Sequence, residues 1–204
     1  QYGICNFSRY DFEELIDQYR NHADDTLPYG IVITPHHDSN GAFRDYSAIW
    51  ADLAQQLKGK YRLRFIEAQS KSDILGRLKQ CHQVHPNHKI GFLFLGGHGS
   101  PESINFGGEG QGKKLLKDDV SHIDVSRLQK FFVEEPPVVL ISCSTGVDNG
   151  IAQSLSNVSG DVVAPIRDTQ LRGIKANMDG EKIAFDVKYT GADTTRRYKY
   201  GLAA

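Results

Sequence analysis

The chain has 204 residues, of which 39% are hydrophobic and 24% charged, with 20 Gly and 7 Pro. This composition is ordinary for a globular protein and excludes a disordered chain, a collagen-like repeat and a coiled coil. The formal net charge of −1 argues against a nucleic-acid-binding platform, which usually carries a basic excess. No apolar run reaches the roughly 18 residues of a membrane-spanning helix. We therefore expect one soluble domain.

Apolar periodicity alternates between strand-like runs and helix-like stretches along the chain. This alternation predicts an α/β fold in which a mostly parallel sheet of about six strands carries helices on both faces. We divide the chain into an N-terminal helical arm, residues 1–29, and one domain, residues 30–204. In chain order, the expected elements are a helix near Phe12–Tyr19, a strand Gly30–Thr34, a helix Tyr46–Lys58, a strand Tyr61–Ile66, a helix Ser72–Cys81, a strand Ile90–Leu95, an irregular stretch Ser100–Asp119, a helix over 125–132, a strand Val138–Ser142, a helix over 150–158, a strand Asp161–Ala164 and an alternating edge strand Lys182–Tyr189.

Residues that follow the predicted strands are the place to look for a site, because open parallel sheets bind ligands beyond the carboxyl ends of their strands. His98-Gly99 comes just after the third strand, and Cys143 just after the fourth. If these two strands are neighbours, His98 and Cys143 lie side by side. A thiol beside an imidazole can act as a nucleophile, and backbone N–H groups at such strand ends can stabilise an oxyanion. The alternative is structural, with Cys143 a buried small hydrophobe and His98 a turn residue.

Chain order separates several hydrolase architectures. Papain-like enzymes and α/β-hydrolases place the histidine after the nucleophile. No histidine follows His122 in this chain, and no G-x-S-x-G motif is present. A histidine about 50 residues before the cysteine is the caspase arrangement, and here the separation is 143 − 98 = 45.

The residues around Cys143 carry a resemblance to a known family. Val138–Gly146, followed by Gly150–Leu155 and Val162–Pro165, resembles the clan CD cysteine peptidases and is most similar to CHAT-type sequences. The resemblance covers about Gly30 to Asp168. It implies a caspase-like three-layer sandwich and a cysteine endopeptidase that acts on a protein or peptide substrate.

The same resemblance implies roles for three residues. Cys143 would be the nucleophile that attacks the peptide carbonyl, and His98 would protonate the leaving amine. The backbone N–H groups of Gly99 and Cys143 would form the oxyanion hole. No metal or organic cofactor is expected.

The substrate preference stays open because this sequence departs from its relatives. Metacaspases and legumain carry an acidic residue two positions before the cysteine, where this chain has Ile141, and Arg44 matches a caspase specificity arginine only loosely. A basic, an acidic or an apolar P1 side chain all remain possible. The residues expected to contact substrate are His37, Asp38, Ser142 and Asp168, with Asp148 and Asp161 as further acidic pocket residues.

Two further groups of side chains need an interpretation. The histidines of 36–37 and of 82–88 lack a second cluster with ligand spacing, so we expect no metal site. Basic residues on 113–117 and on the C-terminal segment are expected to be solvated. Self-cleaving cysteine protease domains of large toxins, which resemble this pattern, respond to inositol hexakisphosphate, so a small-molecule or polyphosphate activator stays open. The same resemblance implies that the chain is either cytoplasmic or a fragment of a secreted effector or toxin. These basic residues are Lys113, Lys114, Lys117, Lys182, Lys188, Arg196, Arg197 and Lys199.

Two alternative functions remain beside the peptidase. One is a catalytically silent caspase-like module that binds or regulates a partner. The other is a cysteine acyl transferase that uses the same pair of residues. The sequence predicts no nucleic-acid or membrane partner and does not indicate an oligomeric state.

Overall fold

A computed structural model describes residues 27–38, 41, 43, 46–84, 86–121 and 130–204 of the chain. The expected N-terminal helical arm lies almost entirely outside these residues. Most of the expected helix over 125–132 and the loosely matched Arg44 lie outside them as well.

The centre of the fold is a seven-stranded sheet in the order β12-β11-β8-β7-β3-β1-β2. Pairings within the run from β2 to β8 are parallel, whereas β11 joins β8, and β12 joins β11, in antiparallel fashion. The α/β class is therefore confirmed, but the sheet is mixed and has seven strands rather than about six. Its strands are β1 (Tyr29–Pro35), β2 (Arg62–Ala68), β3 (Ile90–Gly96), β7 (Val138–Ile141), β8 (Asp161–Pro165), β11 (Thr195–Lys199) and β12 (Leu202–Ala203).

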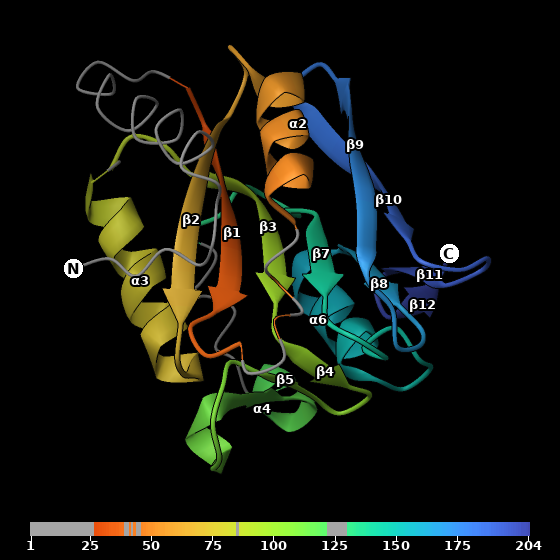
Figure 1. Cartoon of the computed structure of the whole chain (residues 1–204). Helices are drawn as coiled ribbons and strands as arrows, with labels where there is room; N and C mark the ends of the chain where they lie inside the picture. The colour runs from red at the N-terminus through yellow and green to blue at the C-terminus, as the bar shows by residue number, and fades with distance from the viewer. Residues whose placement is uncertain (1–26, 39–40, 42, 44–45, 85, 122–129) are drawn as a thin grey trace.

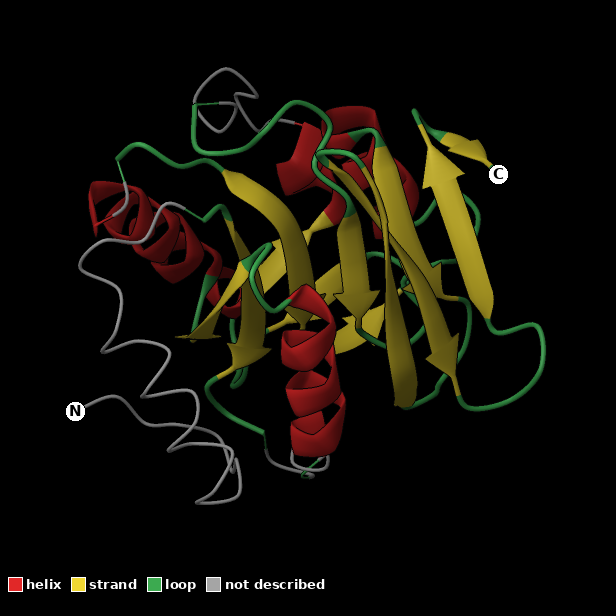
Figure 2. Cartoon of the chain, turned by 90° about the horizontal axis from the view of Figure 1, so that it is seen from above, coloured by secondary structure: helices red, strands yellow, loops and turns green. Residues whose placement is uncertain are grey.

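Helices cover both faces of this sheet, as the alternation predicted (Figures 1 and 2). The helix α2 (Ser47–Leu57) packs Trp50 and Leu53 on the face that carries Phe92 and Phe94. The opposite face is covered by α3 (Lys71–Val84) and α6 (Ile151–Ser159). Side chains alternate between the two faces of a strand, so every central strand packs side chains into the hydrophobic cores on both faces of the sheet.

The alternating segment Lys182–Tyr189 is a strand, but it is not the sheet edge that its pattern predicted. It forms β10, which pairs with β9 (Leu171–Asp179) in a separate two-stranded hairpin. The hairpin lies flat on the α2 side, where the Phe185 ring centroid is 4.9 Å from those of Phe92 and Phe94. An alternating strand has one apolar face in either setting, so the pattern could not distinguish them.

The stretch Ser100–Asp119, expected to be irregular, is largely ordered. It contains β5 (Ser103–Asn105), a 3-10 helix η2 (Gln111–Lys113), β6 (Lys114–Leu116) and the start of α4 (Lys117–Ser121). Together with β4 (His98–Ser100), the two strands form a small antiparallel sheet. Ile104 and Phe106 are fully buried, and these two side chains anchor the small sheet below the carboxyl ends of the main strands (Figure 1).

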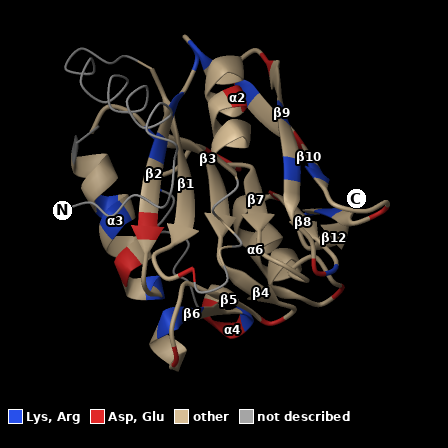
Figure 3. Ribbon diagram, viewed as in Figure 1, with Lys and Arg blue, Asp and Glu red and all other residues tan. Residues whose placement is uncertain are grey.

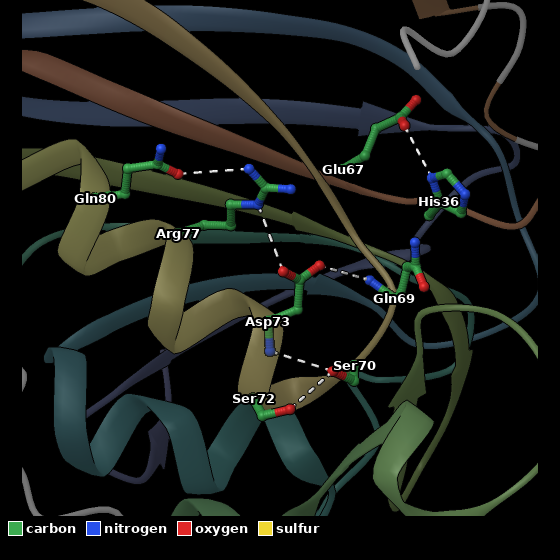
Figure 4. Close-up of polar contacts among 8 residues, drawn as sticks. All are labelled: His36, Glu67, Gln69, Ser70, Ser72, Asp73, Arg77 and Gln80. Carbon is green, nitrogen blue, oxygen red and sulfur yellow. Dashed lines mark hydrogen bonds and ion pairs between the residues drawn. The ribbon is translucent and has the colours of Figure 1, made fainter. Parts of the chain in front are cut away.

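The turn from β2 into α3 is fixed by a capping arrangement (Figure 4). The Asp73 N–H donates to Ser70 Oγ at 3.2 Å, and the Asp73 carboxylate accepts from the Gln69 N–H at 3.1 Å. Arg77 lies 3.4 Å from the same carboxylate, one helical turn later. Reciprocal bonds of this kind satisfy the free N–H groups of a helix start and fix its position. Among the described residues, no helix is both long and apolar enough to cross a membrane.

Candidate active site

His98 and Cys143 meet at the carboxyl edge of two neighbouring strands. In the register of β3 against β7, Gly96 lies opposite Ile141, and each strand continues by two residues to reach the histidine and the cysteine. The backbones touch at Gly99, where an added Cβ would stand 2.6 Å from the Cys143 nitrogen and closer still to its carbonyl oxygen. Only glycine fits such an approach. The structure therefore brings together the three residues that the sequence singled out.

The imidazole of His98 is held from two sides by the loop that follows β1. Its Nε2 atom is buried and lies 3.7 Å from Asp38 Oδ1, which is within ion-pair distance but longer than a hydrogen bond. The Asp38 carboxylate is 7% exposed and accepts a hydrogen bond of 2.9 Å from the Phe43 N–H. The Phe43 ring packs edge-on against the imidazole at 5.8 Å. A carboxylate and an aromatic ring thus restrict the orientation of the histidine.

The thiol of Cys143 lies beside the segment that follows β8. Its Sγ atom donates to the Thr169 carbonyl at 3.4 Å. Ser144 has a left-handed φ of 58°, and its N–H donates to the Arg167 carbonyl at 3.2 Å. The Cys143 N–H has no hydrogen-bond acceptor among the described residues, which leaves it available to an incoming oxygen.

Tyr46 is a site residue that the sequence did not indicate. Its buried hydroxyl accepts a hydrogen bond of 3.2 Å from the Leu171 N–H, two residues beyond the Thr169 carbonyl that faces Cys143. Burial raises the pKa of Tyr46, and the nearby Cys143 and Asp38 act in the same direction. In the sequence Tyr46 looked only like the start of an amphipathic helix, and nothing local marked it as a neighbour of the thiol.

The predicted substrate-contact residues fall in different surroundings. His37 is exposed and packs against the backbone of Gly107, where an added Cβ would stand 2.9 Å from the His37 carbonyl oxygen. Asp38 faces His98 instead of open space. Ser142 is 2% exposed, and its hydroxyl is 3.5 Å from the Leu95 carbonyl, which argues against the predicted contact between Ser142 and a substrate.

The three acidic pocket candidates also separate. Asp168 is exposed and accepts a hydrogen bond of 3.1 Å from Ser144 Oγ, directly beside Cys143. Asp148 pairs with Arg196, so its charge is already neutralised. Asp161 is the first residue of β8 and therefore lies at the opposite edge of the parallel strands, where it pairs with Arg197 at 3.2 Å. This position argues against the predicted role of Asp161 in the substrate pocket, because His98 and Cys143 follow the carboxyl ends of β3 and β7.

Two of the described histidines outside this site contact side chains that do not belong to it. His36 Nδ1 lies 3.1 Å from Glu67 Oε2, and its ring points to that carboxylate (Figure 4). His82 packs on the Phe131 ring at a centroid distance of 5.3 Å. Within the described residues, no group of three or more His, Cys, Asp and Glu could hold a metal ion.

Basic residues lie on the β9–β10 hairpin and on β11, and others lie on β2 and α3 (Figure 3). Lys182 and Lys188 are exposed on β10. Arg197, in contrast, binds the Asp161 carboxylate and the Phe185 carbonyl, and Lys117 lies 3.7 Å from Glu102. Some of these basic side chains are thus already paired with groups of the protein itself. A polyphosphate activator stays a prediction.

A protein-family model matches the part of the chain that contains most of this site. Residues 63–177, more than half of the chain, match a domain of unknown function, DUF8616. The chain belongs to the DUF8616 family. The DUF8616 region runs from β2 to β9 and contains His98, Cys143 and Asp168, but it does not include Asp38. No curated protein matches the chain.

Proposed function

We propose that this chain is a caspase-like cysteine endopeptidase whose nucleophile is Cys143 and whose general acid and base is His98. The contact between the Gly99 backbone and the Cys143 backbone carries the proposal, because it sets the histidine strand end and the cysteine strand end against each other. The strand order β2-β1-β3-β7-β8-β11 supports it, since both residues then follow the central strands of the sheet.

The chemistry requires only groups at this edge. His98 takes the thiol proton of Cys143, and the thiolate attacks the carbonyl carbon of a peptide bond. The N–H groups of Cys143 and Gly99 receive the negative charge that develops on the carbonyl oxygen. The C–N bond then breaks as His98 returns its proton to the leaving amine, and water hydrolyses the acyl-enzyme that remains.

Asp38 is the positioning residue in this scheme. Its Oδ1 lies 3.7 Å from Nε2 of His98, so the proposed scheme assigns the exchange of a proton with the thiol to Nδ1. A buried carboxylate at this distance from an imidazole stabilises the imidazolium that forms during the reaction. The Thr169 carbonyl accepts from the Cys143 thiol, and the Tyr46 hydroxyl binds the Leu171 N–H two residues further along the same segment.

The experiment that tests the proposal is cleavage of a diverse peptide library by the full chain and by Cys143→Ala. We expect the parent protein to cleave a subset of peptides and the variant to lose activity by roughly 10³-fold or more, because the nucleophile is essential to covalent catalysis. Cys81→Ala is the matched control, since Cys81 lies on α3 away from the site. Equal cleavage by the parent and the Cys143→Ala variant would overturn the proposal.

Two outcomes would favour the alternative functions. A folded parent protein that cleaves no peptide in the library would favour a silent binding or regulatory module. Transfer of the acyl group to an added amine in preference to water would favour an acyl transferase, because the same acyl-enzyme precedes both reactions.

A further inference from the structure

Asp168 belongs to the segment that faces the thiol of Cys143. Ser144, the next residue after the cysteine, donates a hydrogen bond from its hydroxyl to Asp168 Oδ1 at 3.1 Å. Thr169 follows Asp168 in the chain, and its carbonyl oxygen lies 3.4 Å from Cys143 Sγ. The segment is held on both sides, because the Arg167 carbonyl accepts from the Ser144 N–H and Thr169 Oγ1 donates to the Thr190 carbonyl at 2.9 Å. The segment that carries Asp168 is therefore held next to the residue that follows the nucleophile.

Asp168 also differs from the acidic residues around it. Each of Asp148 and Asp161 forms an ion pair with an arginine of β11. Asp38 lies against His98. Asp168 is exposed, and within the described residues the Ser144 hydroxyl is its one hydrogen-bond donor and no cation pairs with it. A fixed, solvent-facing carboxylate of this kind can accept a charge-assisted hydrogen bond from a ligand.

We infer that Asp168 selects substrates with a cationic side chain, arginine or lysine, at P1, the residue whose carbonyl Cys143 attacks. This inference rests on the proposed function and adds the substrate class. The P1 side chain leaves the backbone one bond from the attacked carbonyl carbon, so it lies next to the Cys143–Ser144 backbone. Asp168 is the acidic residue that accepts a hydrogen bond from the Ser144 side chain, and its second carboxylate oxygen can bind a guanidinium or an ammonium group.

Two neighbouring arginines make an acidic P1 side chain the alternative, and the test must distinguish it from a cationic one. Arg167 precedes Asp168, and Arg172 binds Thr190 Oγ1 through its Nε at 2.7 Å. If either guanidinium, rather than the carboxylate, faced the P1 side chain, the preferred substrate would be acidic. Of these three charged side chains, only Asp168 is bonded to the residue next to the cysteine, which favours a cationic P1.

The test compares matched peptides that differ only in arginine or citrulline at P1, because citrulline has the same shape without the charge. We expect kcat/KM for arginine to exceed that for citrulline by roughly 10- to 100-fold, the range typical of a hydrogen bond to a charged group. Asp168→Asn keeps an oxygen for Ser144 but removes the charge. It should bring the ratio of kcat/KM for arginine to that for citrulline to about 1, because the charge that distinguishes the two substrates has lost its partner.

Asp186→Asn is the control variant, since Asp186 is also exposed and also accepts a single side-chain hydrogen bond, from Asn177 at 2.8 Å, but on the outer face of the β9–β10 hairpin. It should keep the parent ratio. A preference for glutamate over arginine that disappears in Arg167→Gln or Arg172→Gln would overturn the inference. So would an arginine preference that survives in Asp168→Asn. Either result leaves the peptidase in place, whereas absence of cleavage for every P1 residue contradicts the proposed function itself.

Discussion

The parallel strands β1, β2, β3, β7 and β8 and the C-terminal region, residues 166–204, contribute to the candidate site in different ways. The parallel strands carry the reacting groups at their carboxyl ends, with His98 after β3, Cys143 after β7 and Asp38 after β1. The C-terminal region supplies groups that surround these. Thr169 faces the thiol, Leu171 binds Tyr46, and Asp168 binds Ser144.

The C-terminal region also holds the loop that follows Cys143. Tyr198 of β11 is buried, and its hydroxyl is 3.0 Å from the Gly146 carbonyl and 3.2 Å from the Asp148 carboxylate. Arg196 pairs with the same carboxylate. The comparison shows that the reacting groups come from the parallel strands, whereas the groups that hold them in position come from the C-terminal region. Substitutions in the first region should change the rate of the chemical step, and substitutions in the second should change stability, positioning or substrate preference.

The largest effect is expected from Asp38→Asn, which acts on the first region. The asparagine keeps an acceptor for the Phe43 N–H but loses the charge beside His98. We expect kcat to fall by about 10²-fold with little change in KM, because a positioning carboxylate acts on the transition state. Steady-state kinetics on one good peptide, with thermal unfolding as the control for folding, measures this. A rise in KM at constant kcat would instead place Asp38 in substrate binding, as the sequence first suggested.

Tyr198→Phe should give a smaller effect of a different kind. It deletes the buried hydroxyl and leaves the Gly146 carbonyl without its donor, which costs about 1 kcal/mol of unfolding free energy. Activity should fall only severalfold, because the nucleophile loop loosens while the reacting groups remain. Chemical denaturation of this variant and of Tyr200→Phe, whose ring is 59% exposed, measures the difference. Equal stability of the two variants would show that Tyr198 does not anchor the loop.

The smallest effect is the pH dependence expected from the Asp148–Arg196 pair. Hydrogen bonds from Arg196 and from Tyr198 lower the pKa of the Asp148 carboxyl. A lowered pKa in the folded state stabilises the fold above the unfolded value, about 3.9, and this stabilisation is lost as the pH falls through the folded value. The melting temperature of Asp148→Asn should therefore lie below that of the parent at about pH 6 and approach it below about pH 4. A difference that stays constant over this range would contradict the role of the charge.

The central part of the fold could be predicted from the sequence because its signal is local. The apolar runs of β3 and β7 indicate buried parallel strands by themselves. Two strands of this kind have their carboxyl ends at one edge, so the neighbouring positions of His98 and Cys143 followed from the order of elements. The prediction depended on one condition, that these two strands are neighbours, and β3 and β7 do pair in the sheet.

The remaining parts depend on packing between segments far apart in the chain. The three polar residues 36–38 look alike in sequence, yet His36 pairs with Glu67, His37 packs on Gly107 and Asp38 faces His98. The alternation in β10 fits a sheet edge and a surface hairpin equally well. Tyr46 reaches the site through a bond to a residue 125 positions later, so no local signal could reveal it.

The most direct test of the candidate nucleophile is the rate at which iodoacetamide alkylates Cys143 near pH 7, followed by peptide mapping. Cys81 is the internal reference, because burial raises its pKa and leaves little thiolate. We expect Cys143 to react at least about tenfold faster than Cys81, and to slow markedly in His98→Ala, because the imidazole stabilises the thiolate. A Cys143 that reacts no faster than Cys81, or that reacts at the same rate without His98, would contradict a paired nucleophile at this edge of the sheet.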